Sequence, residues 1–306
     1  MAMHRIDDGL YVGSMYSLQG PNDLRAEGVT HILSVVRGNI DYSRLDGFTI
    51  KQIELDDEED EDIMQYFGQA TDFIHSAISQ GTGCLIHCQA GISRSVTICC
   101  AYLMRYRNYS AKGAIAKVQE GRPIANPNPS FREQLELFEQ CNKDVKLDCP
   151  AYRQFKLKIR ASFATACGQA PELDTYVDDT SPRSAEGADV QLRCKKCRRV
   201  LATDRVVVTH KPSESKARLP MANLVANPKM SSMISPYCSQ FFTEPLVWMK
   251  DELSLGKLEG RLDCPKCQSK VGSYHWQGVR CGCDTWIVPA IGLQRGKVDE
   301  IKNSKI

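Results

Sequence analysis

The sequence predicts an α/β domain, with a central sheet flanked by helices, followed by a small β-rich domain. Three observations carry this prediction. Between residues 9 and 141, short strand-like runs alternate with longer runs of helical periodicity. Cysteines paired at short spacing, as in CKKC and CPKC, follow residue 190. The charge changes sign at the same place: residues 1–190 hold 27 acidic and 19 basic side chains, and residues 191–306 hold 10 acidic and 20 basic ones.

The elements of the first domain can be placed in order. Its strand-like segments, rich in β-branched and apolar residues, are residues 9–14, 30–36, 48–55 and 83–88. Its helical segments, which show an apolar stripe or good helix formers, are residues 22–28, 63–79, 94–107, 111–121 and 129–141. Helices alternating with strands favour coverage of both sheet faces, with ligands bound at the carboxyl ends of the strands.

The two domains are separated by a segment of different composition. Residues 151–164 form a basic helical pattern, and residues 171–190 lack periodicity and are rich in Pro, Ser, Asp and Gly. We therefore expect one domain over residues 1–148, a basic helix and flexible linker over 149–190, and a second domain over 191–306. The strand-like runs of the second domain are residues 199–210, 273–281 and 285–291.

Composition limits the class of protein. The chain has 306 residues, is 42% hydrophobic, and contains no apolar run as long as a membrane span. Asp7 and Asp8 stand where a signal peptide would need apolar residues. We therefore expect a soluble intracellular protein without a membrane partner. In a reducing compartment, its 14 cysteines favour metal ligands, reactive thiols or core residues over disulfides.

The end of the strand-like segment at 83–88 carries a candidate nucleophile. There CLIHCQAGISRS passes from an apolar run through a short glycine-containing loop into a helical run. A strand, loop and helix in this order direct backbone N–H groups and the positive helix end at one point, which suits a phosphate. The same setting should hold Cys88 as a nucleophilic thiolate. Arg94 can bind two phosphate oxygens in bidentate fashion.

HCQAGISRS resembles the His-Cys-x5-Arg-Ser signature of the cysteine-dependent protein phosphatases. YVGS, THILSVV, AYLM and NPNPSF resemble their dual-specificity branch over residues 4 to about 142. The alternative, a buried cysteine beside a surface arginine, lacks this context. Low-molecular-weight phosphatases fit poorly because their cysteine lies near the N-terminus and their acid lies far downstream.

The resemblance implies a role for each residue of the motif. Cys88 would form a phosphocysteine intermediate, Ser95 would hydrogen-bond its sulfur, and His87 would orient the loop. Gly91 would permit a turn that a Cβ obstructs. The phosphoryl oxygens would be bound by Arg94 and by the backbone amides of the residues from Gln89 to Arg94, namely Gln89, Ala90, Gly91, Ile92, Ser93 and Arg94.

The proton donor is expected in the acidic run ELDDEEDEDI at residues 54–63, which follows a predicted strand. In the resembled family the acid stands nine residues before a Tyr-Phe-like pair, here Tyr66-Phe67, which indicates Asp57. Asp56 is the adjacent alternative, but strand alternation directs its side chain to the opposite side. Asp62 suits the N-terminus of the following helix.

The other cysteines and histidines of the first domain favour structural roles. Cys84, Cys99 and Cys100 lie in apolar settings, so core packing is favoured over resolution of an oxidised Cys88. His31 and His75 fit apolar strand and helix patterns.

The second domain contains the cysteine pairs Cys194/Cys197, Cys264/Cys267 and Cys281/Cys283. Such pairs are half-sites for tetrahedral zinc, whereas a redox Cys-x-x-Cys would need a βαβ unit that is absent here. We expect two structural zinc ions that stabilise a domain with a modest core. One set of ligands would be Cys264, Cys267, Cys281 and Cys283. The other would be the first pair with Cys238 and His210, with His275 as the rival ligand, although an interleaved arrangement stays open.

The remaining segments resemble a subgroup of dual-specificity phosphatases with a C-terminal zinc-binding domain, the dual-specificity phosphatase twelve type. CKKCRRVL, QFFTEPLVWM and GRLDCPKCQSKVGSYHWQG carry this resemblance. It implies hydrolysis of phosphoprotein substrates, and assembly of the large ribosomal subunit in cytoplasm and nucleus through contact with ribosomal RNA and proteins. The basic second domain is compatible with RNA phosphates as well as with a merely solvated surface.

Two functions from different classes therefore stay open. The first is a dual-specificity phosphatase whose basic zinc module acts in ribosome assembly. The alternative is a binding factor in ribosome assembly with dispensable phosphatase activity.

Overall fold

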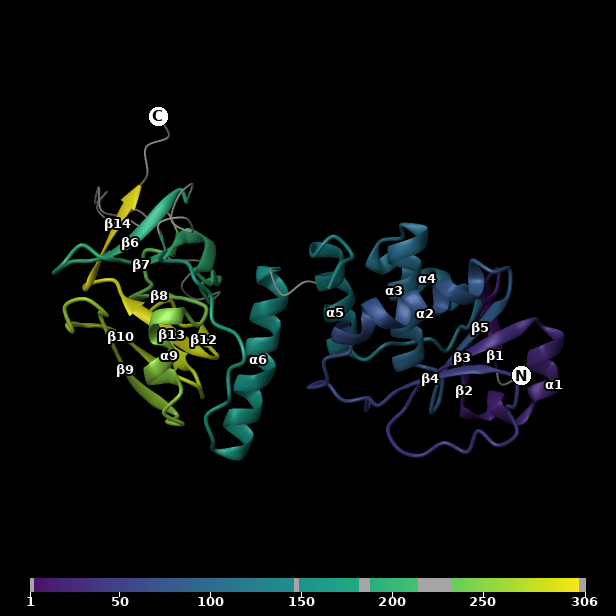
Figure 1. Cartoon of the computed structure of the whole chain (residues 1–306). Coiled ribbons are helices and arrows are strands. Elements are labelled where there is room, and N and C mark those ends of the chain that lie inside the picture. The colour runs from purple at the N-terminus through teal and green to yellow at the C-terminus, as the bar shows by residue number, and fades with distance from the viewer. Residues whose placement is uncertain (1–2, 146–148, 182–187, 214–232, 303–306) are drawn as a thin grey trace. The chain divides into compact units, whose positions relative to one another are not determined.

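The computed structural model describes residues 3–145, 149–181, 188–213 and 233–302. The chain divides into two compact units, Met1–Arg153 and Gln154–Ile306 (Figure 1). Among the helices of the described ranges, none combines the length and the apolar composition that crossing a membrane requires.

The first unit is built on a five-stranded sheet with the order β1-β2-β5-β3-β4. Strands β1 and β2 are antiparallel, and the other neighbouring strands are parallel. The strands are β1 (Met3–Asp7), β2 (Leu10–Ser14), β3 (Val29–Val35), β4 (Thr49–Ile53) and β5 (Gly83–Cys88). Since β5 lies centrally and ends at Cys88, the parallel strands bring this cysteine to the sheet edge where their carboxyl ends meet.

Helices pack on the sheet of the first unit (Figure 1). They are α1 (Pro21–Ala26), α2 (Phe67–Ile78), α3 (Arg94–Arg107), α4 (Ala111–Gly121), α5 (Pro129–Gln140) and the short 3-10 helices η1 (Met15–Gln19) and η2 (Met64–Tyr66). Leu18 and Leu24 pack against Ile32 and Leu85 in one apolar cluster. Helix α3 contacts β5 together with α2, α4 and α5. This confirms the predicted sheet flanked by helices.

The central position of α3 explains its cysteines. Cys99 and Cys100 on this helix and Cys84 on β5 are fully buried. Burial disfavours the thiolate and raises the pKa of all three thiols. These thiols therefore pack as small apolar groups.

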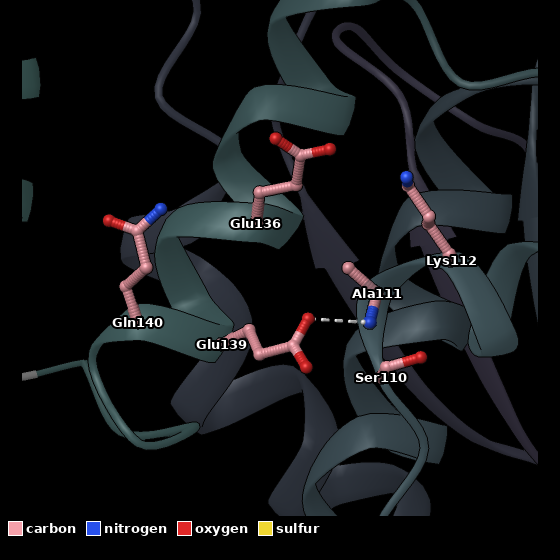
Figure 2. A pocket seen from close by; sticks show the side chains of 6 residues that line it. All are labelled: Ser110, Ala111, Lys112, Glu136, Glu139 and Gln140. Atoms are coloured by element: carbon pink, nitrogen blue, oxygen red, sulfur yellow. Dashed lines mark hydrogen bonds between the residues drawn. The ribbon is translucent and has the colours of Figure 1, made fainter.

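Helix α4 begins against the end of α5. The Ser110 hydroxyl accepts the N–H of Gly113 at 3.1 Å, and the Glu139 carboxylate of α5 accepts the N–H of Ala111 at 2.9 Å (Figure 2). Two N–H groups at this helix terminus are thereby satisfied by side chains.

A disulfide joins Cys141 to Cys149, just before helix α6 (Pro150–Cys167). The sequence favoured ligands, reactive thiols or core residues over disulfides, and this pair is an exception. The two residues lie eight apart in the sequence and their Cα atoms are 5.8 Å apart, within the range that a disulfide can bridge.

In its described residues, the second unit contains three antiparallel sheets, with the orders β8-β13-β10-β9, β14-β6-β7 and β11-β12. Their strands are β6 (Val190–Cys194), β7 (Val200–Thr203), β8 (Gln240–Phe242), β9 (Glu259–Asp263), β10 (Lys270–His275), β11 (Val279–Arg280), β12 (Trp286–Ile287), β13 (Ala290–Gln294) and β14 (Val298–Lys302). Short helical turns are η3 (Asp204–Val206), η5 (Val247–Met249) and α9 (Lys250–Leu253). The predicted small β-rich domain is thus observed.

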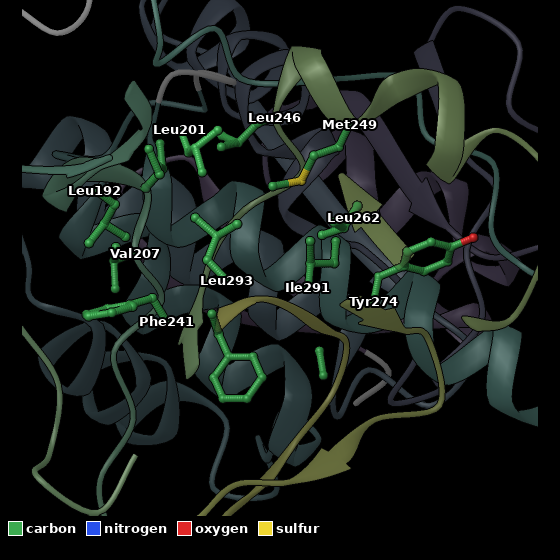
Figure 3. Close-up of a cluster of buried hydrophobic side chains, with 14 of the residues drawn as sticks. Leu192, Leu201, Val207, Phe241, Leu246, Met249, Leu262, Tyr274, Ile291 and Leu293 are labelled. Atoms are coloured by element: carbon green, nitrogen blue, oxygen red, sulfur yellow. The ribbon is translucent and has the colours of Figure 1, made fainter. Parts of the chain in front are cut away.

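A continuous apolar core fills the second unit. Phe241, Leu246, Met249, Tyr274 and Leu293 gather in it (Figure 3), and all are almost fully buried. Trp276 and Phe242 are buried with them.

Several segments of the second unit differ from prediction. The expected strands over residues 273–281 and 285–291 are each divided, the first between β10 and β11 and the second between β12 and β13. The expected strand over residues 199–210 stops at Thr203, whose hydroxyl accepts the N–H of Arg205 and begins η3. Part of the expected linker is packed: Asp179 is buried and accepts the Thr203 hydroxyl at 2.8 Å, and Val177 bridges to Leu246.

Candidate active site and metal-ligand clusters

The loop between β5 and α3 surrounds one buried sulfur. Cys88 is 1% exposed, and its Sγ accepts the N–H of Gly91 at 3.2 Å and the Ser95 hydroxyl at 3.3 Å. Both groups donate a hydrogen bond to the sulfur. The sulfur therefore lies in a nucleophile setting, at the N-terminus of α3.

His87 supports the loop from behind. Its ring is fully buried, Nε2 lies 2.7 Å from the Ser34 hydroxyl of β3, and Nδ1 lies 3.4 Å from the Cys88 carbonyl. Burial lowers the pKa of His87 to about 4, so the ring is neutral at pH 7. Because a carbonyl only accepts, the ring proton is assigned to Nδ1, and Nε2 accepts from Ser34.

The loop is fixed on its other side by an arginine that the sequence did not reveal. Arg122, which follows α4, is 3% exposed and donates to the Gly91 carbonyl at 2.6 Å and the Ala90 carbonyl at 3.0 Å. Gly91 has a φ of +70°, and a Cβ there would lie 2.4 Å from the Gly13 carbonyl oxygen and 2.7 Å from Arg122. Close approach as well as conformation therefore requires glycine.

Arg94, the first residue of α3, has a buried N–H group without a hydrogen-bond partner among the described residues. Its Nη1 donates to the Leu55 carbonyl at 2.8 Å, whereas Nε has no hydrogen-bond partner among the described residues. The side chain is 10% exposed. An unsatisfied buried guanidinium N–H is costly, and an anionic oxygen would satisfy it.

The acidic run places Asp57, rather than Asp56, beside the loop. Asp57 Oδ1 accepts the Ser93 hydroxyl at 2.7 Å and the Asn128 amide at 2.9 Å, while Oδ2 lies 3.8 Å from Arg94 Nε. Asp56 instead pairs with Arg37 at 2.5 Å. The two adjacent carboxylates therefore point to different neighbours, although β4 ends at Ile53 and both aspartates lie beyond the strand.

Residues outside the acidic run form hydrogen bonds and ion pairs with residues near its C-terminal end. Glu61 pairs with Arg37 at 2.8 Å, and its carbonyl accepts the Gln134 amide of α5 at 2.8 Å. Asp62 accepts the N–H of Gln65 at 3.2 Å, which places it at the start of η2 as predicted. The acidic run is thus ordered by partners distant in the sequence.

Eight predicted metal ligands form two clusters. The first contains Cys194, Cys197, Cys264 and Cys267; the second contains His210, Cys238, Cys281 and Cys283. In each, the ligand atoms all lie within 4.8 Å of one another. The predicted grouping by sequence is therefore wrong, and the arrangement is interleaved, because the first two cysteine pairs converge from separate hairpins.

The sulfur spacing fits a tetrahedral metal. Cys194 and Cys267 have their sulfurs 3.8 Å apart, and Cys197 and Cys264 have theirs 3.5 Å apart. Zinc–sulfur bonds of about 2.3 Å in tetrahedral geometry place sulfurs about 3.8 Å apart. In the second cluster His210 Nε2 lies 3.1 Å from Cys283 Sγ, whereas the rival His275 pairs with Glu259 at 3.0 Å.

The cysteine pairs share one backbone conformation. The residues that follow them, Arg198, Gln268 and Asp284, have φ values of 64°, 56° and 68°. Each donates its N–H to the carbonyl of the first cysteine of its pair at 2.9 Å. This tight turn directs both sulfurs of a pair toward one point.

Comparison with known proteins gives one family. Residues 10–141 match the model "Dual specificity phosphatase, catalytic domain". The chain is 33% identical to the tyrosine-protein phosphatase yvh1 of Schizosaccharomyces pombe, covering 98% of this chain and 85% of that protein. It is 37% identical to YVH1 of Saccharomyces cerevisiae, with 97% and 91% covered. It is 29% identical to human dual specificity protein phosphatase 12, with 98% and 89% covered.

Proposed function

Since this chain belongs to the dual-specificity protein phosphatases of the Yvh1 and dual specificity phosphatase 12 group, we propose that Cys88, Arg94 and Asp57 carry its hydrolysis of phosphoproteins. One observation carries the assignment. The Cys88 sulfur accepts two hydrogen bonds at the N-terminus of α3, and Arg94, the first residue of that helix, has a buried Nε without a hydrogen-bond partner among the described residues.

The reaction has two steps. The Cys88 thiolate attacks the phosphorus of a phosphotyrosine, phosphoserine or phosphothreonine, and the bond from phosphorus to the side-chain oxygen breaks as Asp57 gives that oxygen a proton. Water then attacks the phosphocysteine and returns a proton to Asp57, releasing phosphate and the thiolate. Backbone amides from Gln89 to Arg94 and the Arg94 guanidinium bind the phosphoryl oxygens. Ser95 donates a hydrogen bond to the departing sulfur.

Replacement of the nucleophile tests this assignment. Cys88→Ser should abolish hydrolysis of an aryl phosphate while binding of a phosphotyrosine peptide is retained. Cys167→Ser is the matched control, because Cys167 is an exposed thiol of α6 and should leave activity unchanged. Full activity in Cys88→Ser would overturn the assignment.

For the second unit, we propose two structural zinc ions and a role in assembly of the large ribosomal subunit. The sulfur spacing supports the metal sites. The residues from 191 to 306, with 20 basic and 10 acidic side chains, support contact with ribosomal RNA. Zinc would hold the cysteine turns together and stabilise the unit. In this role the protein would act in the cytoplasm and nucleus.

Sedimentation of the full chain with large-subunit precursors tests this role. Binding should weaken steeply as salt rises, since phosphate contacts release counterions. It should survive Cys88→Ser and fail in Cys197→Ser/Cys267→Ser, which lacks two ligands of the first cluster. Loss of binding in Cys88→Ser alone would instead favour recruitment through the phosphatase site. Growth that survives Cys88→Ser would support the alternative of dispensable phosphatase activity.

A further inference from the structure

Asn128 has a fixed orientation at the start of α5. Its side-chain Oδ1 accepts the N–H of Phe131 at 2.8 Å and caps the helix. Its Nδ2 donates to Asp57 Oδ1 at 2.9 Å. The Phe131 N–H can only donate, so it must face the amide oxygen of Asn128. The Asp57 carboxylate accepts, so it must face the amide nitrogen. Both contacts therefore require the same orientation of the Asn128 amide.

A second route leads from Asn128 to the same carboxylate. The backbone N–H of Asn128 donates to the Ser93 hydroxyl at 3.0 Å, and that hydroxyl donates to Asp57 Oδ1 at 2.7 Å. Ser93 is 4% exposed and directly precedes Arg94 in the loop. One residue therefore contacts Asp57 and also the loop that holds the nucleophile.

These contacts use one oxygen of the carboxylate and leave the other directed at the site. Oδ1 accepts both hydrogen bonds, whereas Oδ2 is the oxygen that lies 3.8 Å from Arg94 Nε. A proton carried on Oδ2 would lie on the side of the bound phosphoryl group. A freely rotating side chain would present either oxygen, which lowers the fraction of productive encounters.

We propose that Asn128 is a positioning residue for the proton transfer from Asp57 to the leaving oxygen. It acts through Asp57 and does not contact the substrate. This inference rests on the proposed function, in which Asp57 Oδ2 donates its proton as the bond from phosphorus to oxygen breaks. The cap on Phe131 sets the amide of Asn128, and the amide in turn sets the carboxylate of Asp57.

The test replaces the amide but keeps the cap. Asn128→Ser and Asn128→Thr retain a capping hydroxyl and lose Nδ2. Each is assayed in the full chain with phenyl phosphate, whose leaving group needs a proton, and with 4-nitrophenyl phosphate, whose leaving group needs it far less. We expect kcat to fall about tenfold for phenyl phosphate and less than about twofold for 4-nitrophenyl phosphate. The tenfold loss is a part of the 10²–10⁴-fold acceleration that is typical of general acid catalysis. KM should stay unchanged for both.

Two further variants separate the possible failures. Asp57→Asn should also lower kcat for phenyl phosphate more than kcat for 4-nitrophenyl phosphate, and by a larger factor than the Asn128 variants do. If Asp57→Asn shows no such selectivity, the assignment of Asp57 as the acid is wrong. Ser110→Ala removes the equivalent cap of α4, so it reports what loss of a helix cap alone does. If Asp57→Asn is selective but both Asn128 variants reduce the two substrates equally or not at all, the inference about Asn128 is overturned. A variant that does not fold is replaced by the other hydroxyl variant.

Discussion

Tyr152 and Asp62, 90 residues apart in the sequence, are joined by a hydrogen bond of 2.9 Å from the phenol to Asp62 Oδ2. Tyr152 lies in the first turn of α6 and is 2% exposed. Burial, followed by the charge of Asp62, raises its pKa, so the phenol is a donor at any physiological pH. Both residues belong to the first unit, and their bond helps to hold the acidic run in place.

Tyr152→Phe should lower the free energy of unfolding of the first unit by about 1–3 kcal/mol, because it leaves a carboxylate without one buried donor. Unfolding in urea, followed by intrinsic fluorescence, measures the change. Tyr16→Phe is the control, since Tyr16 is 70% exposed. Equal stability of the two variants would contradict a role for the bond.

The two adjacent aspartates should behave differently. Asp57→Asn removes the proposed proton donor and should lower kcat for phenyl phosphate about 10²-fold or more. Asp56→Asn breaks only an exposed pair with Arg37 and should change kcat by less than about threefold. Steady-state kinetics of both variants decide between them, and a larger loss in Asp56→Asn would reverse the assignment.

Glu58, Glu59 and Asp60 are exposed near the site and should repel a phosphate dianion. Replacing all three by their amides should lower KM for a phosphopeptide several-fold at low ionic strength, and the difference should shrink at high salt because exposed charges are screened. KM measured at two salt concentrations tests this. An unchanged or raised KM at low salt would contradict the prediction.

His87 should make stability depend on pH. Its pKa is lowered by burial to about 4 from 6.5, so the unfolded chain binds the proton more tightly than the folded one. The contribution of the neutral His87 ring to the free energy of unfolding is therefore complete above pH 6.5. It is lost as the pH falls toward 4, by about 3 kcal/mol in all. In urea unfolding, the stability difference between wild type and His87→Gln should therefore be smaller at pH 5 than at pH 7.

Zinc content can distinguish the interleaved clusters from grouping by sequence. Cys197→Ser/Cys267→Ser removes two ligands of one cluster and should cost one zinc per chain. Cys197→Ser/Cys238→Ser removes one ligand from each cluster and should cost both. Grouping by sequence predicts the reverse for these two variants, so atomic absorption of the purified proteins gives a clear answer.

Local sequence signals predicted much of the fold. The run GCLIHC and the helix from Arg94 were placed correctly, since an apolar strand, a glycine loop and an amphipathic helix are all encoded by neighbouring residues. Strand β1 was missed, because MHRID is short and mostly polar and is held by its pairing with β2. The Cys141–Cys149 disulfide was missed for a related reason: no local signal specifies which cysteines meet.

By itself the sequence determined which residue types could perform the chemistry: a cysteine before a glycine loop, an arginine six residues later, an acidic run after a strand, and pairs of cysteines at zinc spacing. Only the tertiary structure decided their partners. It placed Arg122 under Gly91, Asn128 on Asp57, Tyr152 on Asp62, and the cysteine pairs in interleaved clusters. The physical reason is that side-chain type and spacing are local properties, whereas contacts between distant segments are set by how strands and helices pack.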